Sequence, residues 1–427
     1  MTATDDHSDA EFAPPTPSLA GAWPTWLMIG ATGFGGPAGQ VALLHRELVE
    51  RRRWLAEDEY LAALRVCMLL PGPEAQQLAT YAGWRLHGIV GGLVSGTLFV
   101  LPGAVLVTLL AWLHTAGGAL PLVAAAVAGA RPAAVALVAL AAWRIGRKSI
   151  RSTPATAIAV VAGVALAWGL PFPLVVAVAA AAGCLVLPRT APRPTPAASA
   201  SADRRDGGTP VRHAALVVGV AAAIWMLGYV AVTRLGLAGG RGPAIATLFT
   251  ETTLLSLGGA YAVVPWALDE AVARGWLLPD ERLDALAMGE ATPGPLILVV
   301  TFIAFLAGWR AGAAPAAGFE GAAVATAFAF LPSFAMILAV APVVRRIEPG
   351  SLPARAMEGV GAAVVAAIVL LAASLARTAF LPEGRPDLIA VAVAVASGLA
   401  LAYRWLPTPL VILAAAAVGI TSAWLAA

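Results

Sequence analysis

Long apolar runs separated by short polar stretches make up most of this chain. Apolar segments lie near residues 20–44, 60–83, 88–113, 120–143, 154–169, 171–187, 214–237, 243–267, 284–308, 315–343, 355–380, 387–403 and 408–425. About 20 mostly apolar residues in an α-helix span a bilayer core, and these runs lack the strand alternation of a membrane barrel. The pattern predicts an all-α polytopic membrane protein with about 10–13 membrane segments.

Composition supports this class and argues against others. Of the 427 residues, 60% are hydrophobic and 12% are charged, whereas soluble proteins carry about 25% charged residues. A net charge of +3 gives no sign of nucleic-acid binding, so the lipid bilayer is the expected partner. The five histidines show no metal-ligand spacing, and we find no nucleophile constellation or phosphate loop. We therefore expect neither an enzyme nor a metal or cofactor.

Two polar stretches divide the chain. Residues 1–18 are acidic and proline-rich, which predicts a disordered tail. Residues 188–213 are rich in proline, alanine and serine with five arginines, which is typical of a flexible linker. The resulting units are a first repeat at 19–187 and a second at 214–427. The second begins with an extra helix near 214–237.

The two units repeat each other. Four features recur in the same order: Gly35-Gly36 and Gly258-Gly259, Trp54 and Trp276, Pro71-Gly72-Pro73 and Pro293-Gly294-Pro295, and Pro102 and Pro332. The offset is 223 residues for the first pair, 222 for the second and third, and 230 for the fourth. Gly-Gly, Trp and Pro-Gly-Pro do not arise from low-complexity Ala/Val runs, so we infer an internal duplication.

The extra helix suggests how the halves are oriented. One unpaired crossing between two six-segment repeats makes them antiparallel, which is an inverted repeat. Three basic clusters, at 144–151, in the linker and at 345–355, fall on one side if every segment crosses. The positive-inside rule then places the N-terminus and the linker in the cytoplasm. The basic loop at 46–53 disagrees unless the first or second segment is re-entrant.

The Pro-Gly-Pro motifs predict breaks within two membrane segments. Proline cannot donate a ladder hydrogen bond and disfavours helix in the preceding residue, so one helix should stop and another begin near Pro73. The new helix presents unpaired N–H groups and a positive dipole end, which suit an anion. Discontinuous helices in paired repeats often mark a transporter's substrate site. The alternative is a plain proline kink.

Polar residues beside the breaks could assist. Glu74 and Glu290 are the nearest carboxylates, and an acid beside an anion path could bind and release a proton; alternatively, Glu74 stabilises a first helical turn. Gln76, Gln77 and Thr292 offer neutral donors. Arg65 is either an anion counter-charge or a snorkelling surface residue.

The stretch GFGGPAGQ, residues 33–40, is a further break, and it is only partly repeated by Gly258-Gly259. Gly-rich turns let a ligand approach the backbone, but close helix packing explains them equally well. The expected substrate-binding residues are Gly35, Gly36, Pro37, Arg65, Pro71, Gly72, Pro73, Gln76, Gln77, Gly258, Gly259, Thr292, Pro293, Gly294 and Pro295. Glu74 and Glu290 are the expected proton-coupling residues.

Four long motifs carry a resemblance: GFGGPAGQVALLHRELVERRRWLAEDEYLAAL, CMLLPGPEAQQLATYAGW, TLLSLGGAYAVVPWALDEAVARGWL and LAMGEATPGPLILVVTFIAFLAGW. Together they closely resemble the chromate ion transporter family in its long two-domain form. The resemblance spans both halves and excludes the acidic tail and the linker. It implies a bacterial inner-membrane protein that expels chromate using the proton-motive force, with sulfate as the usual competitor.

The expected function is therefore secondary active efflux of chromate, giving chromate resistance. One alternative is that sulfate or another tetrahedral oxyanion is the physiological cargo. A channel or a non-transporting membrane scaffold is an alternative of a different class. A homodimer is left open by the sequence.

Overall fold

The computed structural model describes residues 17–116, 121–150, 152–187, 210–257, 259–346, 352–382 and 385–426. Most of the predicted tail at 1–18 and of the predicted linker at 188–213 lies outside these ranges, as does Gly258. Over the described residues every regular element is a helix. The predicted all-α polytopic membrane class is confirmed.

The first half contains eight elements. They are α1 (Leu19–Thr32), α2 (Gly36–His45), the π-helix η1 (Arg46–Arg51), α3 (Glu57–Cys67), α4 (Glu74–Ala116), α5 (Pro121–Ser149), α6 (Thr153–Ala167) and α7 (Phe172–Val186). Although α4 is written as one helix of 43 residues, its backbone leaves helical geometry at His87 and Gly88. It is therefore two helices, as the separate apolar segments near 60–83 and 88–113 predicted.

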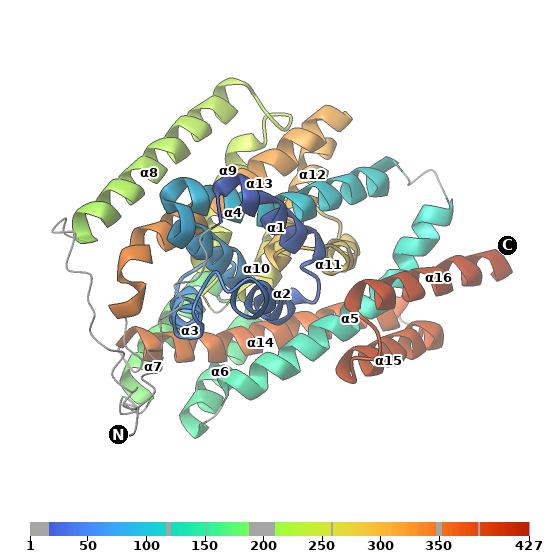
Figure 1. Ribbon diagram of the computed structural model, residues 1–427. Coiled ribbons are helices and arrows are strands. Elements are labelled where there is room, and N and C mark those ends of the chain that lie inside the picture. Colours follow the sequence, from blue (N-terminus) through green and yellow to red (C-terminus); the bar gives the residue numbers. More distant parts are fainter. Residues whose placement is uncertain are drawn as a thin grey trace, which may run out of the picture.

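The second half repeats this order after the extra helix α8 (Pro210–Arg234). Its elements are α9 (Gly242–Leu255), α10 (Ala260–Ala273), α11 (Glu281–Ala291), η3 (Leu296–Leu298), α12 (Val299–Gly312), α13 (Pro315–Val340), η4 (Ala341–Arg346), α14 (Leu352–Phe380), α15 (Leu388–Ala402) and α16 (Thr408–Ala426). Helix α8 lies along α13 at the outside of the bundle (Figure 1). Most of its apolar surface is exposed.

Six of the described helices are long and apolar enough to cross a membrane, and four shorter apolar helices accompany them. The long ones lie in α4, α5, α8, α13, α14 and α16. The predicted segments 20–44 and 243–267 are instead each divided into two short helices. Helix α1 has 14 residues, which is about 21 Å against a hydrocarbon core of about 30 Å. A glycine-rich turn therefore replaces a straight crossing in each of these segments.

Matching contacts confirm the two-half repeat. Trp26 packs against Trp54 at 5.8 Å between ring centroids, and the guanidinium of Arg52 lies 5.2 Å over the Trp54 ring. In the second half Phe249 packs against Trp276 at 6.3 Å, and Arg274 lies 5.3 Å over that ring. The offsets are 222 or 223 residues throughout.

An ion pair is duplicated in the same way. Arg85 donates to Glu59 at 2.8 Å between α4 and α3, and Arg310 donates to Glu281 at 2.6 Å between α12 and α11. In both halves an acid at the start of a short helix is joined to an arginine beyond the following break. The second pair has an additional partner, because the imidazole of His114 from the first half lies 3.6 Å from Glu281.

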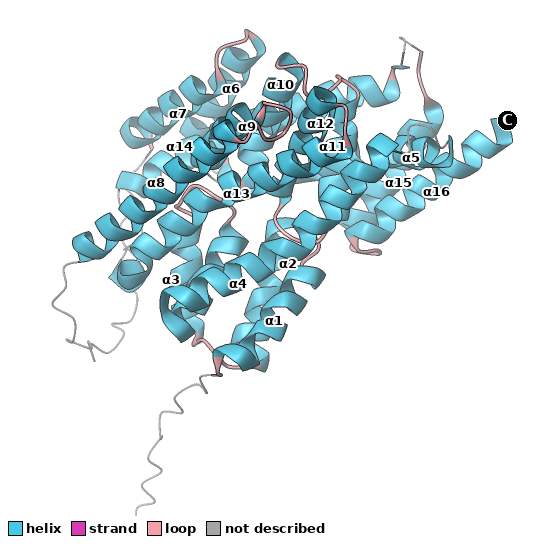
Figure 2. Ribbon diagram, turned by 90° about the horizontal axis from the view of Figure 1, so that it is seen from above, coloured by secondary structure: helices cyan, strands magenta, loops and turns pink. Residues whose placement is uncertain are grey.

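The halves are interwoven rather than placed side by side. The long helix α5 of the first half packs against α15 and α16 of the second, and α14 of the second packs against α6 and α7 of the first. Figure 1 and the turned view in Figure 2 show these two groups of three helices in different parts of the bundle. The two groups also contact each other, because α5 packs against α14, and α4 of the first half packs against α13 of the second.

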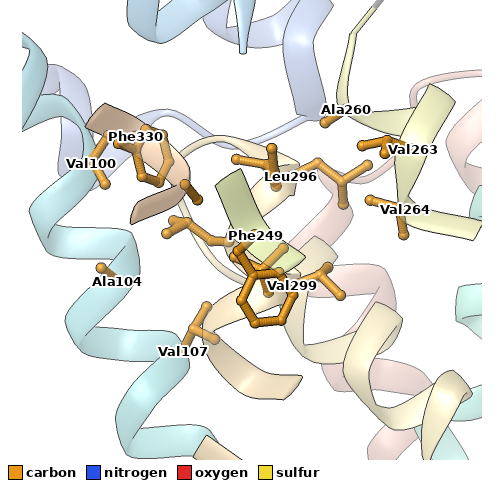
Figure 3. Packing of buried hydrophobic residues seen from close by; sticks show 14 of the residues in the cluster. Val100, Ala104, Val107, Phe249, Ala260, Val263, Val264, Leu296, Val299 and Phe330 are labelled. Carbon is orange, nitrogen blue, oxygen red and sulfur yellow. The ribbon is translucent and has the colours of Figure 1, made fainter. Parts of the chain in front are cut away.

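The core also draws on both halves. Figure 3 shows side chains of α4 facing residues of the second half within one apolar cluster: Val100, Ala104 and Val107 from α4, and Phe249, Leu296 and Val299 from the second half. Burying a valine, leucine or phenylalanine side chain stabilises a fold by about 1.5–3 kcal/mol in water, although lipid reduces this driving force between helices. The helix breaks lie beside this cluster.

Candidate functional site

The first break lies between α3 and α4, as Pro-Gly-Pro predicted. Helix α3 ends at Cys67 and α4 begins at Glu74. Gly72 has φ of +119°, a conformation that other residues rarely adopt. Its N–H donates to Ser256 Oγ of the second half at 2.9 Å. The carbonyl of Pro71 accepts from Gln77 Nε2 at 2.6 Å, so groups released by the break are paired locally and across the repeat.

The second break mirrors the first. Helix α11 ends at Ala291, and the chain resumes helical geometry at Leu296. Gly294 has φ of +99°, and its N–H donates to the carbonyl oxygen of Gly33 at 3.1 Å. Gln40 Nε2 donates to the Gly294 carbonyl at 2.5 Å and to the Gly33 carbonyl at 3.2 Å. Each break is thus tied to the glycine-rich turn of the other half.

Each break also rests on the proline-containing helix of the other half. A Cβ atom at Gly72 would lie 2.8 Å from Ser333 Oγ on α13. A Cβ atom at Gly103 on α4 would collide with the carbonyl oxygen of Pro293. Ser333 and Gly103 directly follow Pro332 and Pro102, the two prolines that correspond to each other in the internal repeat. Small residues at both points allow the close backbone approach that helix packing in lipid favours.

Both breaks open onto one pocket. Its lining residues lie at or near the starts of helices α2, α4, α10 and η3: Pro37, Gln40, Pro73, Glu74, Ala75, Ala260, Pro295 and Leu296. The cavity is small, with a volume of about 10 Å³, which is roughly the room needed by one water molecule. The first N–H groups of a helix lack intrahelical partners and carry the positive end of the helix dipole. The pocket therefore combines helix starts that attract an anion with the carboxyl group of Glu74.

The two predicted carboxylates are related in different ways to the glycine pair of the opposite half. Glu74 Oε2 lies 3.2 Å from where a Cβ atom at Gly259 would stand. Glu290 is buried and accepts a hydrogen bond from Tyr261 at 2.5 Å. The Tyr261 hydroxyl in turn lies 3.5 Å from the Cβ position of Gly36. Glu74 lines the pocket directly, whereas Glu290 reaches this region through Tyr261.

The neutral donors named from the sequence are engaged within the protein. Gln76 accepts from Ser333 at 2.6 Å and donates to Thr80 at 2.9 Å. Thr292 donates to the carbonyl of Gly289 at 3.0 Å. Gln77 supports the first break and keeps one buried oxygen without a hydrogen-bond partner. These side chains hold the breaks and are absent from the pocket lining.

Other predicted residues are spread more widely. Arg65 is exposed on α3, and Gly35 is exposed in the turn before α2; neither belongs to the pocket lining. Gly258 is outside the described residues. Pro37, Pro73, Glu74 and Pro295 are brought together at the pocket.

Four residues of this region were missed by sequence reasoning: Gln40, Ser256, Tyr261 and Ser333. Gln40, Ser256 and Ser333 make polar contacts across the two halves, and Tyr261 donates to Glu290 within the second half. Gln40 and Ser256 flank the paired glycines in sequence, which was the available signal. Tyr261 and Ser333 stand in apolar segments, where the sequence gives no reason to place them beside a partner.

The carboxyl group of Glu281, at the start of α11, stays charged over the physiological range. Burial raises the pKa of Glu281, but hydrogen bonds from His114, Arg310 and a backbone N–H outweigh burial and lower that pKa to about 2. Because the folded pKa is lower than the ordinary value of 4.5, the stability it contributes is lost only as pH falls from that value through about 2. The Glu281 carboxyl group therefore does not titrate near neutrality.

Comparison with known proteins identifies the family of this chain. The family model described as "Chromate transporter" matches residues 22–184 and 243–420, one region in each half. The chromate transport protein of Pseudomonas aeruginosa is 31% identical over 98% of this chain and 95% of its own length.

Two further relatives match over most of the chain. A probable chromate transport protein of Synechococcus elongatus is 28% identical over 92% of this chain and 93% of its own length. The chromate transport protein of Cupriavidus metallidurans is 28% identical over 93% and 91% respectively. No solved structure matches the chain. This multi-pass membrane protein belongs to the chromate transporter family, which comprises transporters rather than enzymes.

Proposed function

We propose that this protein exports chromate across a bacterial inner membrane by secondary active transport, using the proton-motive force and conferring chromate resistance. The observation that carries the proposal is the shared pocket, where Pro73 and Pro295 from the two halves meet beside helix starts. Discontinuous helices at a repeat interface are a recurrent substrate site in transporters. The names of the relatives supply chromate as the substrate.

The direction follows from charge. Moving one elementary charge across 100 mV is worth about 2.3 kcal/mol, and chromate carries two negative charges. An inside-negative membrane potential therefore favours export of the anion, and exchange for protons adds to the driving force. In this proposal the halves are antiparallel, and the N-terminus and the linker face the cytoplasm.

Everted vesicles test the proposal directly. Vesicles containing the protein should accumulate chromate when energised, because their outer face is the former cytoplasmic face. An uncoupler that collapses the proton gradient should remove most of this uptake, and protease added outside should cleave the linker. Unchanged chromate uptake relative to protein-free vesicles, with the protein inserted, would reject the proposal. Sulfate in the same assay separates a chromate exporter from a general oxyanion carrier.

Glu74 is the proposed proton-coupling residue of the pocket. An acid that shares a site with an anion can carry a proton in one direction as the anion leaves in the other. Glu74→Gln should therefore flatten the dependence of transport on pH, because a glutamine amide cannot bind and release a proton as a carboxyl group does. Glu270→Gln, at an exposed helical ion pair with Arg274, is the matched control. An unchanged pH profile in Glu74→Gln would assign Glu74 a structural role.

A further inference from the structure

Gln40 is the side chain that joins the two halves at the rim of the pocket. It is 1% exposed and it lines the pocket. Its Nε2 donates to a carbonyl of its own half at Gly33 and to a carbonyl of the other half at Gly294. An amide nitrogen carries two protons, so both are used on backbone oxygens.

The Gly294 peptide is held at both of its polar groups. Its N–H donates to Gly33, and its carbonyl accepts from Gln40. Gly294 has positive φ and lacks a side chain, so these two hydrogen bonds limit rotation of the backbone there. The next two residues, Pro295 and Leu296, line the pocket. The orientation of Gly294 therefore sets the direction in which the chain enters the pocket wall.

The contact also changes the field that an anion meets. Carbonyl oxygens carry partial negative charge and repel an oxyanion unless a donor occupies them. Gln40 places its N–H groups on two such oxygens beside the pocket. We propose that Gln40 is a positioning residue that sets the oxyanion affinity of the pocket, because it satisfies the Gly33 and Gly294 carbonyls and fixes the second helix break. This inference rests on the proposed oxyanion transport.

The internal repeat carries an apolar residue at the position equivalent to Gln40. The position equivalent to Gln40, at the offset of 223 residues, is Val263, which is fully buried in the apolar cluster. Valine cannot donate a hydrogen bond. The first break is instead tied to the glycine-rich turn of the second half by the hydrogen bond from Gly72 to the Ser256 hydroxyl. Val263 therefore gives a matched control position for packing at the same place in the repeat.

The test compares three substitutions that differ in their donors. Gln40→Met keeps the length of the side chain and removes both donors. Gln40→Glu removes the donors and adds a negative charge, whereas Gln40→Lys keeps donors and adds a positive charge. Chromate and sulfate uptake into everted vesicles would be measured against concentration for each variant and for Val263→Ala, with rates normalised to inserted protein.

We expect Gln40→Met to raise KM at least tenfold, which corresponds to about 1.4 kcal/mol, with little change in maximal rate. Gln40→Glu should raise KM further, and Gln40→Lys should return KM to within a few-fold of the wild type. Val263→Ala should leave KM unchanged. If Gln40→Met fails to insert, the ranking of the Glu and Lys variants makes the same test.

Two results would overturn the inference. One is a KM for Gln40→Met, or for Gln40→Glu, within twofold of the wild type. The other is an equal loss of activity in all three variants, which is the result expected of a packing role. A wild-type protein that moves neither anion contradicts the proposed function instead, so the two failures are distinguishable.

Discussion

Replacing Pro71, Gly72 and Pro73 together by alanine should abolish chromate transport while leaving the protein in the membrane. Alanine favours the helix that Pro-Gly-Pro interrupts, so α3 and α4 can join into one rod. The start of α4 would then leave the pocket. A Cβ atom at Gly72 would also stand 2.7 Å from Gln77 Nε2 and 2.8 Å from Ser333 Oγ, where real Cβ contacts essentially never occur.

The measurement is uptake into everted vesicles, with the inserted amount quantified in the same preparation. Gly236→Ala is a suitable control, because Gly236 also has a positive φ, +61°, but nothing lies within 4 Å of its Cβ position. It should cost about 1–2 kcal/mol of backbone strain and retain transport. Wild-type transport by the triple variant would show that the pocket does not depend on the first break.

Arg131→Met should destabilise the protein by about 3–5 kcal/mol, because it leaves a buried carboxylate without its partner. Arg131 on α5 donates to Asp284 on α11 through two nitrogens, at 2.6 and 2.9 Å, and Asp284 is fully buried. Asp280 accepts a further, longer hydrogen bond at 3.3 Å. The expected result is a lower midpoint of denaturant unfolding in detergent for the purified variant.

The double variant Arg131→Met, Asp284→Leu separates pairing from packing. Exchanging a buried ion pair for apolar side chains is often neutral or stabilising, so most of the lost stability should return. A single variant that loses less than about 1 kcal/mol, the worth of an exposed pair, would show that Asp284 is not buried as described. Because α11 leads into the second break, transport should follow stability in this series.

The helix breaks could be predicted from sequence because their cause is local. Proline removes a donor and glycine permits positive φ wherever they stand, so Gly72 and Gly294 identified both breaks. The duplication was equally visible, since Trp54 and Trp276 recur at a fixed spacing. Segments 20–44 and 243–267 were harder, because a glycine pair in an apolar run is consistent with either a turn or close packing.

The contacts around the pocket could not be predicted, because they join residues far apart in the chain. Gln40 and Gly294 are 254 residues apart, and Gly72 and Ser256 are 184 residues apart. Arg131 likewise stands within an apolar helix, and its place in the sequence gives no indication of which acid it meets. Pairings of this kind depend on how the halves interweave, and an amphipathic pattern carries no information about that.

The exchange of short helices between the halves has an evolutionary consequence. Because α5 packs against α15 and α16, and α14 packs against α6 and α7, each half is partly covered by helices of the other. After such a fusion, a larger side chain on a helix of one half requires a smaller side chain on the helix of the other half that packs against it. The two copies are thus free to diverge in sequence, yet they must do so in concert.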